Sequence, residues 1–397
     1  FVGFTLLLGD LIVDAYTLSR MLRYIDERQS NVAIFYGGWA HPYTIHRFFN
    51  EMMKNGWDNY DYVESFESRF ADWHGRKYAL MTPCCTHAIH LQLLTLGIKP
   101  NDEVIVPECT WTGSVAPITY IGAKPIFADI SKDNWCLDPI SVEKRITKKT
   151  KAIISVDLYG NMPDYDKLLN ISKKYKIPII EDAAHAIGAS YDGKPIGSIS
   201  EFTTFSFQAI KHFTTGDGGM LTIKDKKLEA KAKRIRWFGI DRTKKQKGTW
   251  ENDVDEIGYK YQMTDISATM GYDSLLEFKS ILSHRQKIFN TYLRNLSPNK
   301  KIFCVNDYDS KKTHAAWLFT ILVDNKDFLQ KKLREYSIET NQVHFRNDRY
   351  SIFKKFVKGK KFKNMDYLEN RYLVLPLHHK VTVSMAEYIC KLINRFV

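Results

Sequence analysis

The chain has 397 residues, of which 44% are hydrophobic, which is enough for one large core and a smaller second one. None of its apolar stretches is long enough to span a membrane, and Phe1–Gly9 lacks the basic leader of a secretory signal, so no membrane partner is expected. The net charge of +13 raises the question of a nucleic-acid partner.

Much of that charge lies in one stretch, Lys224–Lys247, which holds eleven Lys and Arg residues against three Asp and Glu residues. The stretch carries no RNA- or DNA-binding motif, and the spacing of its first half predicts a helix with its charges toward solvent. We therefore expect no nucleic-acid partner. The stretch is a solvated basic helix and loop that can attract an anionic substrate.

The six cysteines include one adjacent pair, Cys84 and Cys85, but no CxxC motif and no zinc-site spacing. This usage predicts reduced thiols in a cytoplasmic protein. His87 and His90 lie three residues apart, but no third ligand is evident, so no metal site is expected.

Along the chain, residues 1–45 contain one helix-like and one strand-like stretch and predict no function. From about Asn55, short apolar runs alternate with helical stretches; the runs are Glu103–Pro107, Lys124–Ile130, Lys151–Gly160 and Ile177–His185. Such alternation predicts an α/β fold with a mainly parallel sheet covered on both faces. From about Glu277 a long helix leads into a smaller mixed region. We expect three segments, 1–45, 46–276 (the large domain) and 277–397 (the small domain).

Lys211 stands out because it follows the strand-like "TTFSF" and precedes the strand-like "GGMLTI". Most lysines keep their ammonium group in water, so this one is either a snorkelling loop residue or a functional group. Asp182 follows four apolar residues and is either a structural carboxylate or a functional one. Together, a lysine that forms an imine and a carboxylate that keeps a pyridine nitrogen protonated are what a pyridoxal 5'-phosphate site requires.

Three further features fit that cofactor. The stretch Thr82–Ile98 reads as a turn that opens a helix, whose first amides near Thr86 and His87 would point at a phosphate. Ser206 can add a hydroxyl donor, and Trp111 offers a flat face to a pyridine ring. Each signal alone is weak, since a tryptophan can simply pack and a threonine can simply cap a helix.

From about Asn55 to the C-terminus the sequence resembles the DegT/StrS-type nucleotide-sugar aminotransferases. The most specific matches are "EDAAHAIGASYDGKPIGSIS", which contains Asp182, and "FSFQAIKHFTTGDGGML", which contains Lys211. The collinear segments "GAKPIFADI", "LYGNMPDYDKL", "EIGYKYQMTDISATMGYDSL" and "LPLHHKVT" also match. The resemblance implies a fold-type I PLP-dependent transferase, with a large, mainly parallel domain and a smaller C-terminal α+β domain.

The resemblance also implies a role for each matching residue. Lys211 would be the Schiff-base lysine and Asp182 the partner of the pyridine nitrogen. The remaining cofactor contacts would be His185 at the ring hydroxyl, Trp111 stacked on the ring, and Thr86, His87 and Ser206 at the phosphate.

The sequence departs from the family pattern at several positions. Cys85 stands where a glycine often precedes the phosphate-binding threonine. Lys260 replaces an asparagine that reaches the phosphate across a dimer, and Gln262 replaces an arginine. Residues 1–45 do not resemble the usual amino-terminal segment. We still expect a homodimer with shared active sites, in which Lys260 contacts the neighbouring cofactor as a charge.

The resemblance implies a nucleotide-linked keto-deoxysugar, ketonic at C3 or C4, as the amino acceptor and glutamate as the donor. His344 and Arg346, in the segment Val343–Phe353, are the candidate substrate contacts, with an ordinary surface loop as the alternative.

Two other functions are compatible with the same sequence. A sugar dehydratase on this scaffold has histidine at the lysine position, whereas here Lys211 is retained and His212 follows it. A regulatory or binding protein without turnover is the other alternative, motivated by the basic stretch and by residues 1–45.

Overall fold

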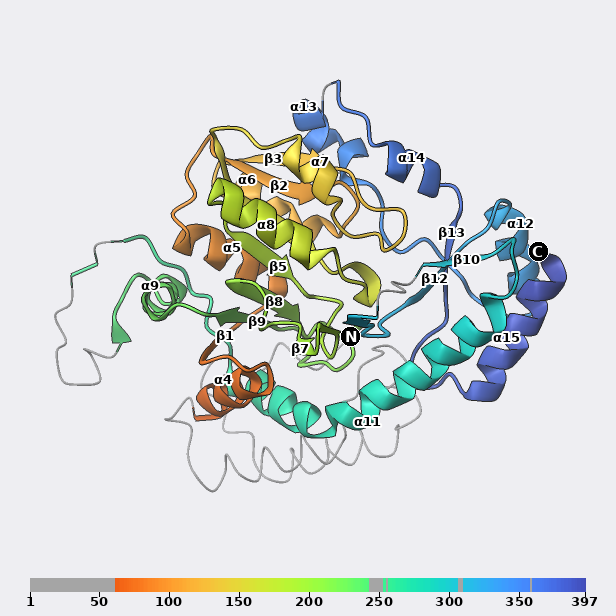
Figure 1. Cartoon of the computed structure of the whole chain (residues 1–397). Helices are drawn as coiled ribbons and strands as arrows, with labels where there is room; N and C mark the ends of the chain where they lie inside the picture. The colour runs from red at the N-terminus through yellow and green to blue at the C-terminus, as the bar shows by residue number, and fades with distance from the viewer. Residues whose placement is uncertain (1–60, 243–252, 255, 306–309, 358) are drawn as a thin grey trace, which may run out of the picture.

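The structure is a computed structural model that describes residues 61–242, 253–254, 256–305, 310–357 and 359–397 (Figure 1). The predicted segment 1–45 and the first residues of the predicted large domain lie outside these ranges. In the described part of the chain, no helix combines the length and apolar character needed to cross a bilayer.

A seven-stranded sheet forms the centre of the larger part, with the strand order β1-β9-β8-β5-β4-β2-β3. Its strands are β1 (Tyr78–Thr82), β2 (Glu103–Pro107), β3 (Lys124–Ala128), β4 (Thr150–Val156), β5 (Ile179–Asp182), β8 (Phe202–Ser206) and β9 (Gly219–Ile223). Neighbouring strands pair in parallel except at β9, which is antiparallel to both β1 and β8. The predicted α/β architecture with a mainly parallel sheet is confirmed.

Helices cover both faces of this sheet, and alternate strand residues supply the two cores. Val104 and Val106 of β2 join the core that includes Ile89, whereas Ile105 joins Leu168 on the opposite face. The helices of this part are α4 (Asp61–Trp73), α5 (Cys85–Thr95), α6 (Ala116–Tyr120), α7 (Pro139–Glu143), α8 (Tyr165–Tyr175) and α9 (Lys226–Arg236), with 3₁₀ turns η1 (Thr112–Ser114) and η2 (Leu158–Gly160).

The predicted basic helix is α9, which covers the first half of the stretch Lys224–Lys247. Asp225 caps it by accepting hydrogen bonds from the backbone N–H groups of Lys227 and Leu228. Its basic residues in the last turn complement the negative end of the helix dipole.

The long helix α11 (Asp265–Leu296) connects the two parts of the molecule. Figure 1 shows it running from beside α4, below the sheet, to the smaller part beside α15 (Val383–Phe396). It begins twelve residues before the predicted start of the long helix at Glu277, so the predicted 276/277 division falls inside a continuous helix.

The smaller part is built on an antiparallel sheet, β10-β12-β13, packed against α11, α12 and α15. Its elements are β10 (Phe303–Val305), β12 (Phe319–Leu322), β13 (Tyr372–Leu375) and α12 (Lys326–Glu335). The segment between α12 and β13 holds η3 (Asn347–Arg349), η4 (Ser351–Phe353), α13 (Lys354–Val357) and α14 (Lys363–Leu368), and its Phe353 and Met365 join the core of the larger part. A third, small sheet joins β6 (Ser190–Tyr191), β7 (Lys194–Pro195) and β11 (Lys312–Thr313).

The parallel pairing brings several strand ends to one edge of the central sheet. Val156, the last residue of β4, is paired with Asp182, the last residue of β5. Ser206 at the end of β8 is paired with Gly219 at the start of β9. This edge, where the carboxyl ends of the parallel strands meet, is where open α/β sheets bind ligands.

Candidate active site

A cavity of about 450 Å³ opens at this edge of the sheet. Seven of the ten residues predicted from the sequence line it: Thr86, Trp111, Asp182, His185, Ser206, Lys211 and His344. They come from β5, β8, the start of α5 and four connecting segments. Chain folding therefore brings together residues that are up to 258 positions apart, from Thr86 to His344.

The Lys211 side chain is buried in this cavity, with 8% of its surface exposed. Burial lowers its pKa to about 8, against the opposing influence of Cys85 and Asp182. A substantial fraction of this amine is therefore neutral near physiological pH, as a nucleophilic lysine requires.

Asp182 is also buried, and three donors surround its carboxylate. Ser114 Oγ donates to Oδ2 over 2.6 Å, the Ala184 backbone N–H donates to Oδ1 over 3.1 Å, and Cys85 Sγ lies 3.7 Å from Oδ1. Burial raises the pKa of Asp182, whereas these donors and Lys211 lower it. Because Asp182 is two residues from Ile180, it lies on the same face of β5, the face that α5 covers.

The start of α5 forms another part of the cavity wall. Cys84 is the N-cap residue of α5, but its side chain makes no capping hydrogen bond. The first N–H groups of a helix have no intrahelical acceptor and carry a partial positive charge. With the hydroxyl groups of Thr86 and Ser206 also lining the cavity, this part of the wall is suited to bind an anion.

Gly219 allows the start of β9 to lie close against the start of α5. A Cβ atom at position 219 would lie 2.5 Å from the carbonyl carbon of Cys84 and 2.6 Å from the backbone nitrogen of Cys85. The start of β9 therefore approaches the start of α5 too closely for any side chain at position 219. Glycine is required there by packing.

His185 is held as a neutral imidazole. Burial lowers its pKa well below the usual value, and Lys211 adds to this effect. The Tyr159 backbone N–H donates to His185 Nδ1 over 3.4 Å, so the ring proton resides on Nε2, which can donate to a ligand. Its ring stacks on Trp317, with centroids 3.8 Å apart.

Trp111 and His344 lie at the mouth of the cavity, with their ring centroids 6.3 Å apart. Trp111 is 62% exposed, which leaves its ring available to a ligand. His344 is buried, and its Nδ1 has no hydrogen-bond partner in the described structure. A β-bridge between Cys109 and Arg346 brings the segment with His344 to this place.

Three predicted residues do not line the cavity. The His87 ring stacks on Tyr261, with centroids 4.3 Å apart, so only its position in the first turn of α5 relates it to the anion site. Lys260 is exposed and places its Nζ atom 3.3 Å from the centroid of the Trp237 ring.

Arg346 is the third, and its position does not fit a substrate contact. Its guanidinium is paired with Asp348 at 2.8 Å, Asp366 at 2.5 Å and Glu369 at 3.3 Å. The side chain is buried among these carboxylates rather than directed into the cavity. We therefore remove Arg346 from the predicted substrate-binding residues.

Ser114 and Trp317 are among the lining residues that no sequence pattern singled out. Ser114 lies in the 3₁₀ turn directly after Trp111, and Trp317 lies just before β12. Neither belongs to a pattern that marks it as functional, because the contacts that matter are distant in sequence.

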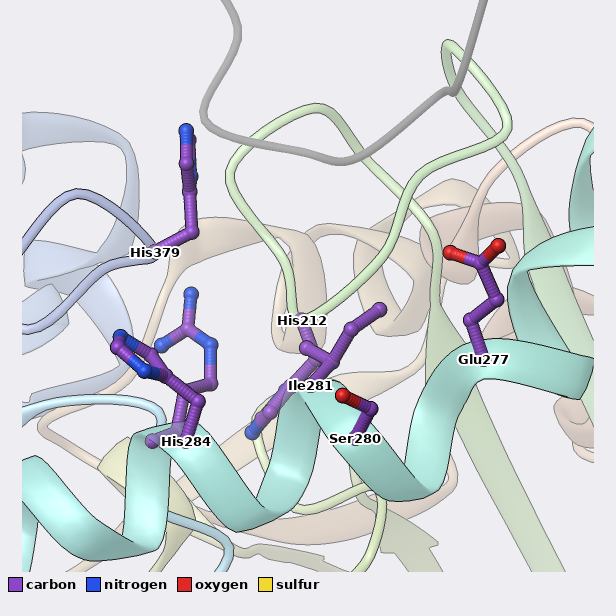
Figure 2. Close-up of a pocket in the computed structure, with 7 residues that line it drawn as sticks. His212, Glu277, Ser280, Ile281, His284 and His379 are labelled. Atoms are coloured by element: carbon purple, nitrogen blue, oxygen red, sulfur yellow. The ribbon is translucent and has the colours of Figure 1, made fainter. Parts of the chain in front are cut away.

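A second cavity, of about 210 Å³, lies along α11 and shares no lining residue with the first. Figure 2 shows Glu277, Ser280, Ile281 and His284 on α11, with His212 and His379 contributed by other segments. In the described ranges, no group of three or more His, Cys, Asp or Glu side chains is arranged to hold a metal ion.

Comparison with known proteins identifies the family. The model of the DegT/DnrJ/EryC1/StrS aminotransferase family matches residues 43–394. The chain belongs to this family. The resemblance inferred from the sequence motifs is thereby confirmed. Because the family consists of aminotransferases, the chain is an aminotransferase.

Among relatives in the DegT/DnrJ/EryC1/StrS family, GDP-perosamine synthase of Escherichia coli O157:H7 is 32% identical over 354 residues, covering 88% of this chain and 94% of that protein. UDP-4-amino-4-deoxy-L-arabinose--oxoglutarate aminotransferase of Shewanella sediminis is 33% identical over 342 residues, covering 81% of this chain and 87% of that protein.

Solved structures agree with this family assignment. AtS13 from Actinomadura melliaura matches with a TM-score of 0.85 and 27% identity, over 91% of this chain and 97% of that one. Spr1654 from Streptococcus pneumoniae, in its PMP form, matches with a TM-score of 0.82 and 27% identity, over 91% of this chain and 98% of that one. The predicted fold class is confirmed.

Proposed function

We propose that this chain is a pyridoxal 5'-phosphate-dependent aminotransferase that moves an amino group from glutamate to a nucleotide-linked 3-keto- or 4-keto-deoxysugar. The observation that carries the proposal is the buried Lys211 amine, with its pKa lowered to about 8, in one cavity with the buried Asp182 carboxylate. The names of the relatives, a GDP-perosamine synthase and an aminotransferase for a UDP-linked aminoarabinose, support the substrate class.

The residues of the cavity fit this cofactor. Asp182 is buried with three donors around it and no arginine partner among the described residues, an arrangement suited to a protonated ring nitrogen. The uncapped start of α5, with Thr86 and Ser206, is suited to the phosphate. Trp111 would cover the ring, and His185 Nε2 would donate to the ring oxygen. Spr1654 has been solved in both a PLP form and a PMP form.

When bound there, the cofactor supplies an electrophilic carbonyl carbon and a ring that stabilises negative charge at the α-carbon of the donor. Lys211 Nζ would be the amine that holds the cofactor and, when not bonded to it, the base that takes up and returns the α-proton of the donor. Its pKa of about 8 allows both protonation states near neutral pH. Asp182, in its ionised form, would keep a proton on the ring nitrogen.

We also propose a homodimer in which each site takes Lys260 from the neighbouring chain. Lys260 is exposed and does not line the cavity of its own chain. This placement is expected of a residue that contacts the active site of another subunit. His344 stays as the proposed substrate contact, because its Nδ1 is unpartnered at the cavity. We place the enzyme in the cytoplasm, which the six free cysteine thiols support.

The test is a two-step assay of the purified, cofactor-loaded protein. Glutamate alone should bleach the visible absorption band of the cofactor, and nucleotide-linked 3-keto or 4-keto sugars should then restore it and yield an amino sugar. A panel of both ketone positions on different nucleotides identifies the substrate. A protein that binds the cofactor but responds to neither glutamate nor any sugar would be a binding protein, and the proposal would fail.

A further inference from the structure

Trp317 touches the reactive lysine through two different interactions. Its side chain is buried, and its indole Nε1–H donates a 3.0 Å hydrogen bond to the backbone oxygen of Ile210, the residue before Lys211. The Lys211 Nζ atom lies 4.3 Å from the centroid of the indole ring. One side chain thus holds both the backbone that carries the lysine and the ammonium group at its end.

The same indole also supports His185. The two rings are nearly parallel, at 11°, with their centroids 3.8 Å apart. Tyr159 lies on the same aromatic cluster, with its ring 6.3 Å from that of Trp317 and inclined by 21°. A buried imidazole packed in this way has little freedom to rotate, so the direction of its Nε2–H group depends on the position of Trp317.

The backbone of Trp317 is itself anchored to the long helix. Arg285 of α11 donates through Nη1 to the carbonyl oxygens of Trp317 at 3.1 Å, Ala316 at 3.3 Å and Leu377 at 3.1 Å. Trp317 is therefore a fixed element that enters the site from the segment before β12, rather than a side chain that follows the lysine loop.

We propose that Trp317 is a positioning residue for the reaction, which orients the Lys211 amine through its N–H group and holds the lysine ammonium on its ring face. The inference rests on the proposed function, because it assigns a task in cofactor attachment. It extends the site to a residue that touches two of the proposed cofactor-binding groups.

The charged and titratable groups around Lys211 set the background for a test. Asp182 and Cys85 favour its ammonium form, whereas His185, His212 and His344 are buried imidazoles that feel its charge. Trp317 differs from all of these because its side chain does not titrate. Replacing Trp317 changes the ring face that the Lys211 ammonium contacts, without changing the formal charge of the site.

The experiment measures how fast the cofactor-free protein forms its visible band with pyridoxal 5'-phosphate between pH 6 and 10. The midpoint of this profile reports the pKa of the Lys211 amine, and the plateau at high pH reports how well the neutral amine is oriented. Trp317→Phe keeps a ring face but removes the N–H donor, whereas Trp317→Leu removes both. Trp73→Phe is the control, since Trp73 ends α4 and its ring packs against Phe70 and Phe278, away from the residues that line the cavity.

Both Trp317 variants should lower the plateau rate several-fold, because both lose the hydrogen bond to Ile210. The midpoint should fall by about 0.5–1 pH unit in Trp317→Leu and by less in Trp317→Phe, because loss of the ring face disfavours the ammonium. Trp73→Phe should leave the midpoint and the plateau unchanged, although it removes packing against Phe70 and Phe278.

Variants of Trp317 that are less stable but keep the midpoint and plateau of the wild type would overturn the proposed positioning role. If Trp317→Leu does not fold, the plateau in Trp317→Phe decides, because that variant preserves most of the ring volume. A wild-type protein that never forms the band would overturn the proposed function and this inference with it. The two failures are therefore distinguishable.

Discussion

Ser114 Oγ donates a 2.6 Å hydrogen bond to Asp182 Oδ2, and both side chains are buried. Thr110 lies on the far side of the serine hydroxyl, with its Oγ1 3.0 Å from Ser114 Oγ. A hydrogen bond to the charged form of a carboxylate lowers its pKa, which opposes the effect of burial. Ser114 therefore helps to keep Asp182 ionised inside the protein.

The first prediction concerns this hydrogen bond. Ser114→Ala should raise the pKa of Asp182, because the carboxylate loses a hydrogen bond that favours its charged form. Because the proposed role of Asp182 requires the ionised form, the acidic limb of the pH profile for bleaching by glutamate should move to higher pH. Ser114→Thr should restore the profile. An acidic limb that does not move in Ser114→Ala would show that the serine has no such role.

The second prediction concerns Lys211. Lys211→Ala should abolish covalent attachment of the cofactor, because the amine that bonds it is missing. The measurement is reduction with borohydride followed by peptide mapping, in which the wild type should carry the label only on Lys211. Lys227→Ala, at an exposed position on α9, is the control and should be labelled normally. Label found on another lysine of the wild type would refute the assignment.

The third prediction concerns Asp182. Asp182→Asn should still bind the cofactor, but its glutamate half-reaction should slow by orders of magnitude, because an amide does not stabilise a protonated ring nitrogen. Glu181→Gln is the matched control, since Glu181 is buried on the opposite face of β5, where its carboxylate accepts a hydrogen bond from Thr203 Oγ1. Near-normal turnover in Asp182→Asn would remove this residue from the mechanism.

The fourth prediction concerns Lys260 and the dimer. Loss of a charge partner from a desolvated phosphate should weaken cofactor binding by about 1–3 kcal/mol in Lys260→Ala. Mixing Lys211→Ala chains with Lys260→Ala chains should then restore activity, because one of the two sites in each mixed dimer has both lysines intact. Mixed dimers that stay as inactive as their impaired parents would show that Lys260 does not act across the interface.

The fifth prediction separates stability from substrate binding at Arg346. Arg346→Met leaves Asp348, Asp366 and Glu369 without their buried cation, and should lower the free energy of unfolding by on the order of 3 kcal/mol in urea denaturation. Arg349→Met is the control, because Arg349 also pairs with Glu369 but its side chain is 62% exposed, so about 0–1 kcal/mol is expected. A large rise in KM for the sugar with unchanged stability would instead return Arg346 to the substrate site.

The sequence predicted most strands of the central sheet, and it selected Asp182 and Lys211, which the structure brings into one cavity. Val and Ile runs such as Glu103–Pro107 must be covered on both faces, which requires a mainly parallel sheet, and a polar residue that ends such a run emerges at the ligand-binding edge. Asp182 and Lys211 could be selected for this reason, because a charged group beside buried strands needs a partner or a task.

The side chains that surround these two residues come from distant segments, so they could be identified only from the way the fold packs those segments together. Ser114 reaches Asp182 across 68 positions, and Trp317 reaches Ile210 across 107. Arg346 was predicted to contact substrate because it lies in the segment that contacts substrate in the family that the sequence resembles. Its carboxylate partners Asp366 and Glu369 lie on another segment and hold its guanidinium away from the cavity. Local sequence patterns report burial and chain direction, whereas the pairing of buried polar groups depends on which segments the fold packs together.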